Sequence, residues 1–156
     1  MKFRISYGYR MFGTVQYIQS EISFDTIRHA ERFCTLTLGD SYLGLDISID
    51  HETVCAISGL SSSCLWKACQ ITLPDAKNGR LIAAVPDVVR GCGYSYSGDW
   101  YIYYDQSAKV ILISKSTYGT NCCDDLQYVR FLENAIAVLF REELIAIYIE
   151  DITACM

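Results

Sequence analysis

Residues 42–58, which read YLGLDISIDHETVCAIS, contain the pattern that decides the expected fold. Apolar side chains alternate with other residues over 43–49, a polar turn follows at 50–53, and a second β-rich run begins at Val54. A polar turn between two such runs is typical of a β-hairpin. The alternation directs the odd-numbered apolar side chains, Ile49 included, toward a core and leaves Asp46 and Ser48 facing water.

A second hairpin is predicted over 100–114, WYIYYDQSAKVILIS, where a polar turn separates two β-rich runs. One or two short strands are expected within 2–18. A strand over 65–73 is expected to return at 80–85 after a turn at 74–79 that contains proline and glycine. The apolar run 144–150 is interpreted as a last, central strand, with continuation of a preceding helix as the alternative.

Two helices complete the expected fold. Apolar residues recur at spacings of three or four from Leu126 to Phe140, after an acidic start that resembles a capping box. A shorter helix is expected from Asp25, as the N-cap, to Cys34. The sequence therefore predicts an α+β fold, in which a mostly antiparallel, meandering β-sheet carries one main C-terminal helix and a short N-terminal helix, as a single domain over 1–156.

Composition and charge narrow the function classes. The 156 residues include 13 basic and 18 acidic side chains, for a formal net charge of −5. This balance argues against a nucleic-acid partner, whose phosphates attract a basic surface. It suits a basic protein partner, although solubility alone also explains it. No apolar run has the length of a membrane helix and no secretion signal is visible, so no membrane partner and a cytoplasmic location are expected.

Eight cysteines are many for this length. Without a secretion signal they are expected to stay reduced, mostly as core or bystander thiols. The chain has no Cys-x-x-Cys and no His-x3-His, so no metal site and no cofactor are predicted. A redox or zinc role for Cys92, Cys122 and Cys123 is the alternative, because the adjacent pair precedes the expected helix.

The sequence contains no assembled catalytic motif. Only His29 and His51 could act as an imidazole base, and neither has an identified cysteine partner. Asp46 interrupts an apolar strand, which the alternation explains. No phosphate-binding glycine loop is present. We therefore do not expect an enzyme, while carboxylate or cysteine chemistry in a pocket stays open as an alternative function.

An aromatic cluster is the strongest candidate for a binding surface. Tyrosines and two acids are interleaved over 94–105, and tyrosine is a favoured anchor at protein interfaces. The predicted partner contacts are Tyr94, Tyr96, Asp99, Tyr101, Tyr103 and Asp105. The alternative is an ordinary tyrosine-rich strand that is covered on both faces.

The two hairpins, YLGLD with VCAISGL and WYIYYD with VILI, resemble those of small bacterial toxin-immunity proteins, including those of contact-dependent growth inhibition systems. The resemblance implies a cytoplasmic, acidic protein that neutralises a toxin domain, such as a nuclease, by blocking its active site or another surface. It carries over no functional residue and does not explain the cysteine content. A structural subunit that assembles through a sheet edge is a further alternative, and the oligomeric state is left open.

Overall fold

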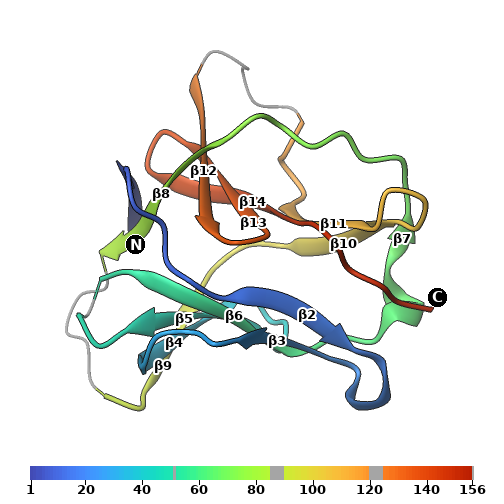
Figure 1. Cartoon of the computed structure of the whole chain (residues 1–156), viewed down its shortest axis with the longest axis horizontal. Coiled ribbons are helices and arrows are strands. Elements are labelled where there is room, and N and C mark those ends of the chain that lie inside the picture. The colour runs from blue at the N-terminus through green and yellow to red at the C-terminus, as the bar shows by residue number, and fades with distance from the viewer. Residues whose placement is uncertain (51, 85–89, 120–124, 156) are drawn as a thin grey trace.

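The computed structural model describes residues 1–50, 52–84, 90–119 and 125–155. They form two β-sheets that lie as two layers in Figure 1. The eight-stranded sheet has the order β1 (Lys2–Tyr7), β8 (Lys77–Ala84), β12 (Leu126–Leu132), β13 (Ala135–Phe140), β14 (Glu143–Ile149), β11 (Val110–Lys115), β10 (Trp100–Asp105) and β7 (Lys67–Ala68). The six-stranded sheet has the order β2 (Thr14–Ile18), β3 (Ser23–Ile27), β6 (Val54–Leu60), β5 (Leu43–Ser48), β4 (Arg32–Leu38) and β9 (Gly93–Tyr96).

The expected α+β class is wrong, because the described residues form a two-layer β structure. Their helical content is two single turns of 3-10 helix, η1 (Gln19–Glu21) and η2 (Ser63–Leu65). Neither of these described turns comes near the length needed to cross a membrane.

The main C-terminal helix predicted from Leu126 to Phe140 is a β-hairpin instead. Strands β12 and β13 pair antiparallel, and Leu132 pairs with Ala135, so the turn between them holds only Glu133 and Asn134. The strand β13 is buried on both faces, which removes the alternation that normally marks a strand. The resulting continuous apolar run mimicked the spacing of a helix.

The short helix predicted from Asp25 to Cys34 is also wrong. This stretch holds the end of β3 and the start of β4. The connection contains Arg28 in the left-handed region, with φ of 57°, which no α-helix continues through. Thr26 fixes β3 to β6, because its hydroxyl donates to the Ile57 carbonyl at 2.8 Å and accepts from the Ile57 N–H at 2.9 Å.

Both predicted hairpins and the last strand are confirmed. Strands β5 and β6 pair antiparallel, as do β10 and β11, and all of the run 144–150 except Glu150 lies in β14 at the centre of its sheet. One or two strands were expected within 2–18, and the structure forms two there, β1 and β2. The strand expected over 65–73 shrinks to the two residues of β7, and the returning strand β8 pairs with β1 rather than with β7.

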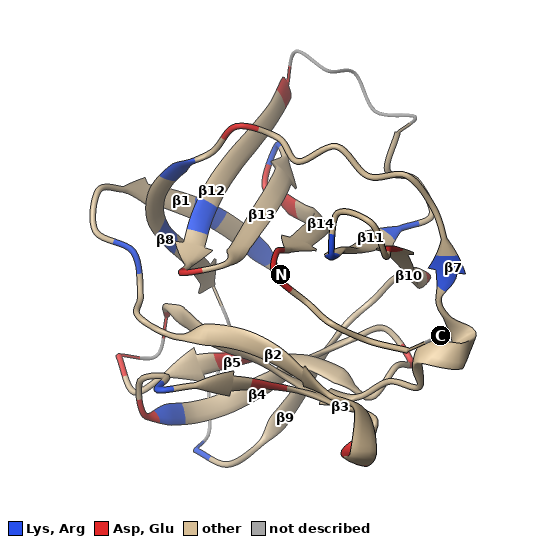
Figure 2. Ribbon diagram, turned by 45° about the vertical axis from the view of Figure 1, so that its right-hand side comes forward, with Lys and Arg blue, Asp and Glu red and all other residues tan. Residues whose placement is uncertain are grey.

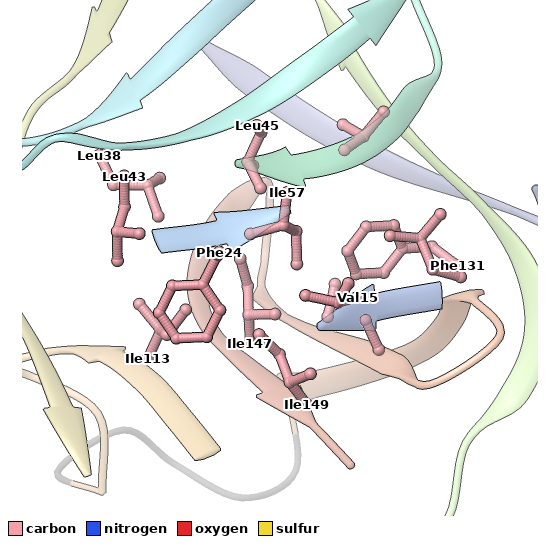
Figure 3. Close-up of a cluster of buried hydrophobic side chains, with 14 of the residues drawn as sticks. Val15, Phe24, Leu38, Leu43, Leu45, Ile57, Ile113, Phe131, Ile147 and Ile149 are labelled. Atoms are coloured by element: carbon pink, nitrogen blue, oxygen red, sulfur yellow. The ribbon is translucent and has the colours of Figure 1, made fainter. Parts of the chain in front are cut away.

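The main core fills the space between the two sheets, as Figure 3 shows. Val15, Phe24, Leu45 and Ile57 from the six-stranded sheet face side chains such as Ile147 from the eight-stranded sheet. A second, smaller core covers the outer face of the eight-stranded sheet. There, Ile136 and Val138 of β13 and Tyr148 of β14 pack against partly buried side chains from the connecting segments, including Ile71, Leu73 and Tyr118.

Asp46 is fully buried rather than exposed to water as the alternation predicted. Its carboxylate accepts hydrogen bonds from Thr35 at 2.6 Å and Ser58 at 3.0 Å, and Arg32 Nε lies 3.2 Å from it. The alternation placed Asp46 on the correct, outer face of β5, but neighbouring polar side chains cover that face. Ile49, expected in the core, is 52% exposed because β5 ends at Ser48.

Hydrogen bonds also join the sheets outside the core, at the β2 edge and at the β5–β6 turn among other places. Asn134, in the β12–β13 turn, is 5% exposed and clasps the edge of β2. Its side chain accepts from the Val15 N–H at 2.8 Å and donates to the carbonyls of Val15 at 2.9 Å and Glu150 at 2.8 Å. At the β5–β6 turn, the Ala83 N–H of β8 donates to the Glu52 carbonyl at 2.9 Å. We call the first set of contacts the Asn134 clasp.

Candidate partner-binding cleft

The structure separates the six residues that the sequence predicted as partner contacts. Tyr96 of β9 is only 7% exposed and packs edge-on against Phe3, with the ring centroids 5.2 Å apart. Burial raises the pKa of Tyr96 to about 12. Tyr94, two residues earlier on β9, is partly buried and also packs against the core. These two tyrosines therefore present little surface to a partner.

Asp105 has a structural role in the described fold. It is 9% exposed, and its carboxylate accepts from the backbone N–H groups of Ile71 at 2.9 Å and Ala108 at 3.0 Å. These hydrogen bonds lower its pKa, with the largest contribution from Ile71. Asp105 thus shapes the β10–β11 turn and fixes the segment after β7.

Asp99, Tyr101 and Tyr103 remain on or near the surface. Asp99 is exposed in the connection that enters β10. Tyr101 is 39% exposed, and Tyr103 lies on the same face of the strand. The Lys67 ammonium of β7 lies 4.7 Å from the Tyr101 ring centroid and 5.9 Å from that of Tyr103. This cation–π contact orients both rings.

An apolar hollow opens between the sheets beside Tyr101. Its volume is about 200 Å³. Leu43 and Leu60 line it from the six-stranded sheet, and Trp100 and Ile102 line it from the eight-stranded sheet. Two crossings between the sheets flank it, at 61–66 and at 97–99. The hollow therefore lies at the open end of the β5–β6 hairpin, away from its turn. At this end the two sheets separate.

Trp66 forms the fixed floor of this hollow. It is 5% exposed, and its indole N–H donates to the Ser61 hydroxyl at 2.9 Å. Its ring centroid lies 4.6 Å from that of Tyr17, 5.6 Å from that of Phe24 and 5.7 Å from that of Tyr104. Such an aromatic cluster is packed from several directions, so the floor keeps its shape when the hollow is filled.

Exposed apolar side chains form the rim. Leu65 is 80% exposed and Leu60 is 52% exposed, and both line the hollow together with Tyr101. Tyr42, at 78% exposure, stands between the lining residues Ser41 and Leu43. Single exposed apolar residues are ordinary on a surface, but several around one apolar hollow mark an interaction site.

An acidic notch adjoins the hollow. It has a volume of about 250 Å³, is lined by Asp40 and Asp99, and shares Ser41, Trp100 and Tyr101 with the hollow. Trp100 Nε1 is buried and has no hydrogen-bond partner among the described residues. We call the hollow and the notch together the Trp100 cleft.

Two lysines also lie near the cleft. Lys115 is largely buried, with its ammonium 4.2 Å from the Tyr96 ring centroid, and burial lowers its pKa while Glu143 at 4.0 Å opposes that shift. Lys67 lies on the exposed side of Tyr101, on strand β7, which is marked in blue in Figure 2. The cleft thus has Asp40 and Asp99 on one side and Lys67 of β7 on the other, and the Lys115 ammonium lies 5.7 Å from the Trp100 ring centroid.

Sequence reasoning missed Leu60, Leu65 and Trp66. The available signal was a tryptophan three residues after the serine-rich segment 61–63, because a large aromatic residue beside a loop is often an anchor. Because 65–73 was interpreted as a regular strand, Trp66 was not recognised as an anchor.

Among the alternative chemistries, the described residues bear on the metal site. They contain no group of three or more potential metal ligands. His29 contacts the Ala30 carbonyl and the Arg32 guanidinium, at 2.7 and 2.9 Å. His51, Cys122 and Cys123 lie outside the described residues.

No protein-family model and no curated protein sequence matches this chain. Its function therefore has to be argued from the Trp100 cleft itself.

Proposed function

We propose that this chain is a cytoplasmic binding protein that holds a cognate toxin domain at the Trp100 cleft and neutralises it by occlusion. The observation that carries the proposal is the anchor-sized hollow on a packed aromatic floor, surrounded by exposed Leu60, Leu65 and Tyr101. Interfaces draw most of their affinity from a few apolar or aromatic side chains buried in such pockets.

The size of the hollow suits a single side chain of a protein partner. Sites for small molecules usually enclose about 300 to 1,000 Å³. The hollow, at about 200 Å³, suits one large side chain of a partner. Burying one leucine or phenylalanine side chain contributes about 1.5–3 kcal/mol, and the exposed rim adds further apolar area.

The charge distribution favours a basic partner. Asp40 and Asp99 lie beside the hollow, and the chain carries a net charge of −5. A partner with a lysine or arginine next to its apolar anchor would place that cation in the notch, against the carboxylates of Asp40 and Asp99. A nuclease has such a surface, because it must attract phosphates. Blocking that surface would prevent access of its substrate without any chemistry by this chain.

Co-expression tests the proposal. The toxin candidate is the product of the gene adjacent to the one that encodes this chain, expressed alone and together with it. We expect survival of the host and a stoichiometric complex that persists through size-exclusion chromatography. Full toxicity in the presence of the soluble chain would contradict the proposal. The proposal would also be contradicted if copies of this chain associated with one another through the cleft and formed no complex with the toxin.

A further inference from the structure

We propose that Cys34 and Cys92 form a reversible dithiol–disulfide pair that links edge strand β9 to β4. This modification site is independent of the proposed partner-binding function. It rests on the position of Cys34 in β4 beside Cys92, the residue directly before β9, and on the difference in their exposure.

The strand register brings the two cysteines side by side. Strands β4 and β9 are parallel, with Thr35 paired to Gly93 and Leu36 to Tyr94. One step back along the same register, Cys34 stands opposite Cys92. The backbones are joined at this point, because the Gly91 N–H donates to the Phe33 carbonyl at 2.9 Å and the Thr35 N–H donates to the Cys92 carbonyl at 3.4 Å.

The two side chains belong to the same face of the sheet. Side chains alternate along a strand, so Cys34 shares a face with Leu36, and Cys92 shares a face with Tyr94. Leu36 and Tyr94 both pack on the core between the sheets. Cys34 and Cys92 also line one shallow surface hollow. Neighbouring strands lie about 4.8 Å apart, which falls within the Cα separation of about 4.4 to 6.8 Å that disulfides span.

The cysteines differ in access, and this difference sets the order of reaction. Cys92 is exposed, whereas Cys34 is 4% exposed and burial raises the pKa of its thiol. The thiolate of Cys92 attacks a small disulfide such as oxidised glutathione and releases one thiol. The sulfur of Cys34 then attacks the Cys92 sulfur of this mixed disulfide and releases the second thiol. In total, the two cysteines lose two electrons and two protons, and the small disulfide gains them.

The consequence is local stabilisation of an edge strand. Among the described strands, β9 pairs with β4 alone, and the chain continues from β9 into Gly98, Asp99 and Trp100 of the cleft. A covalent link at the start of β9 restricts opening of this edge. Disulfides of this kind in a reducing compartment are typically transient and redox-sensing.

Peptide mapping of the full-length chain tests the pair. The protein is equilibrated with mixtures of reduced and oxidised glutathione, quenched with acid, alkylated and digested with trypsin without reduction. Cleavage yields peptides 33–67 and 91–109, and the second contains Cys92 as its only cysteine. We expect these peptides to be cross-linked, with fragmentation assigning the bond to Cys34 rather than to Cys55 or Cys64.

Matched variants make the outcome decisive. The cross-link should vanish in Cys92→Ala, an exposed substitution that preserves the core, and persist in Cys64→Ala, which removes another exposed thiol of the first peptide. Oxidation should raise the Tm of the native sequence by about 5 to 10 °C and leave that of Cys92→Ala unchanged. Cys92 that carries only glutathione, or that links to a different cysteine, would overturn the proposal.

Discussion

The two sheets are joined in contrasting ways at two places. At the β2 edge, the buried Asn134 amide joins the layers by exchanging two hydrogen bonds with Val15, and it donates a third to Glu150, which follows β14 in its own layer. At the Trp100 cleft, the layers separate and leave Leu60 and Leu65 facing solvent. The same sandwich thus uses polar contacts where it is closed and leaves apolar surface where it is open. This contrast suggests that the clasp serves stability and that the cleft serves recognition.

The largest expected effect is on the clasp. Asn134→Ala removes three hydrogen bonds and leaves the Val15 N–H and two carbonyls without their partner. We expect the free energy of unfolding to fall by about 3 kcal/mol, as measured by urea denaturation. Asn78→Ala, at an exposed asparagine of β8, is the control and should change it by less than about 0.5 kcal/mol. A loss below about 1 kcal/mol for Asn134→Ala would show that the clasp does not stabilise the fold.

At the open cleft, substitutions should act on binding instead. Leu65→Ala and Tyr101→Ala remove exposed rim side chains, so each should weaken the complex at least tenfold, or about 1.4 kcal/mol, while unfolding changes little. Calorimetric titration of the toxin domain measures this effect. Tyr9→Ala removes a tyrosine that is 89% exposed in the β1–β2 connection, and it should leave affinity unchanged. Equal losses for Tyr9→Ala and Tyr101→Ala would mean that the cleft is not the site.

The β5–β6 turn contacts the other sheet through Glu52. Asp50 in this turn should make the free energy of unfolding depend on pH. Burial alone would raise the pKa of Asp50, but hydrogen bonds from Ser48, Thr53 and Glu52 lower it well below the ordinary value. A lowered folded-state pKa contributes stability above the unfolded-state pKa of about 3.9, and this contribution is lost as pH falls below it. Asp50→Asn should therefore cost about 1 kcal/mol at pH 7 and flatten the decline in stability on acidification. An unchanged acid limb in urea titrations at several pH values would contradict this assignment.

The smallest expected effect concerns the acidic notch. Asp40→Asn combined with Asp99→Asn should slow association with a basic partner by about threefold at low salt and reduce the salt dependence of the rate. Stopped-flow mixing measures both. Asp75→Asn combined with Asp151→Asn matches the charge change away from the notch-lining residues. An equal effect of this control would assign the attraction to overall charge rather than to the notch.

Local pattern was enough to predict the hairpins at 42–58 and 100–114, because each has one clear polar turn between β-rich runs. It failed for β12 and β13, where burial on both faces erased the alternation and the turn shrank to Glu133 and Asn134. The polar pair Glu133 and Asn134 was the available signal for a hairpin turn. Asn134 of this turn also makes the contacts of the clasp.

The candidate site was less accessible to prediction than the fold. Asp99 and Tyr101, which were predicted as partner contacts, are exposed beside the hollow, but the hollow depends on Leu43, Leu60 and Trp66, which come from distant parts of the chain. Their meeting is set by how the sheets stack, and no local pattern encodes it. Asp46 shows the same limit, because Arg32 and Thr35 cover it from another strand.

Hydrogen–deuterium exchange of the toxin complex tests the central claim most directly. Binding at the Trp100 cleft predicts slowed exchange over 60–67 and 98–103, with unchanged exchange in β1 and β12. Protection confined to β1 and β12, with the cleft segments exchanging as in the free protein, would contradict the account.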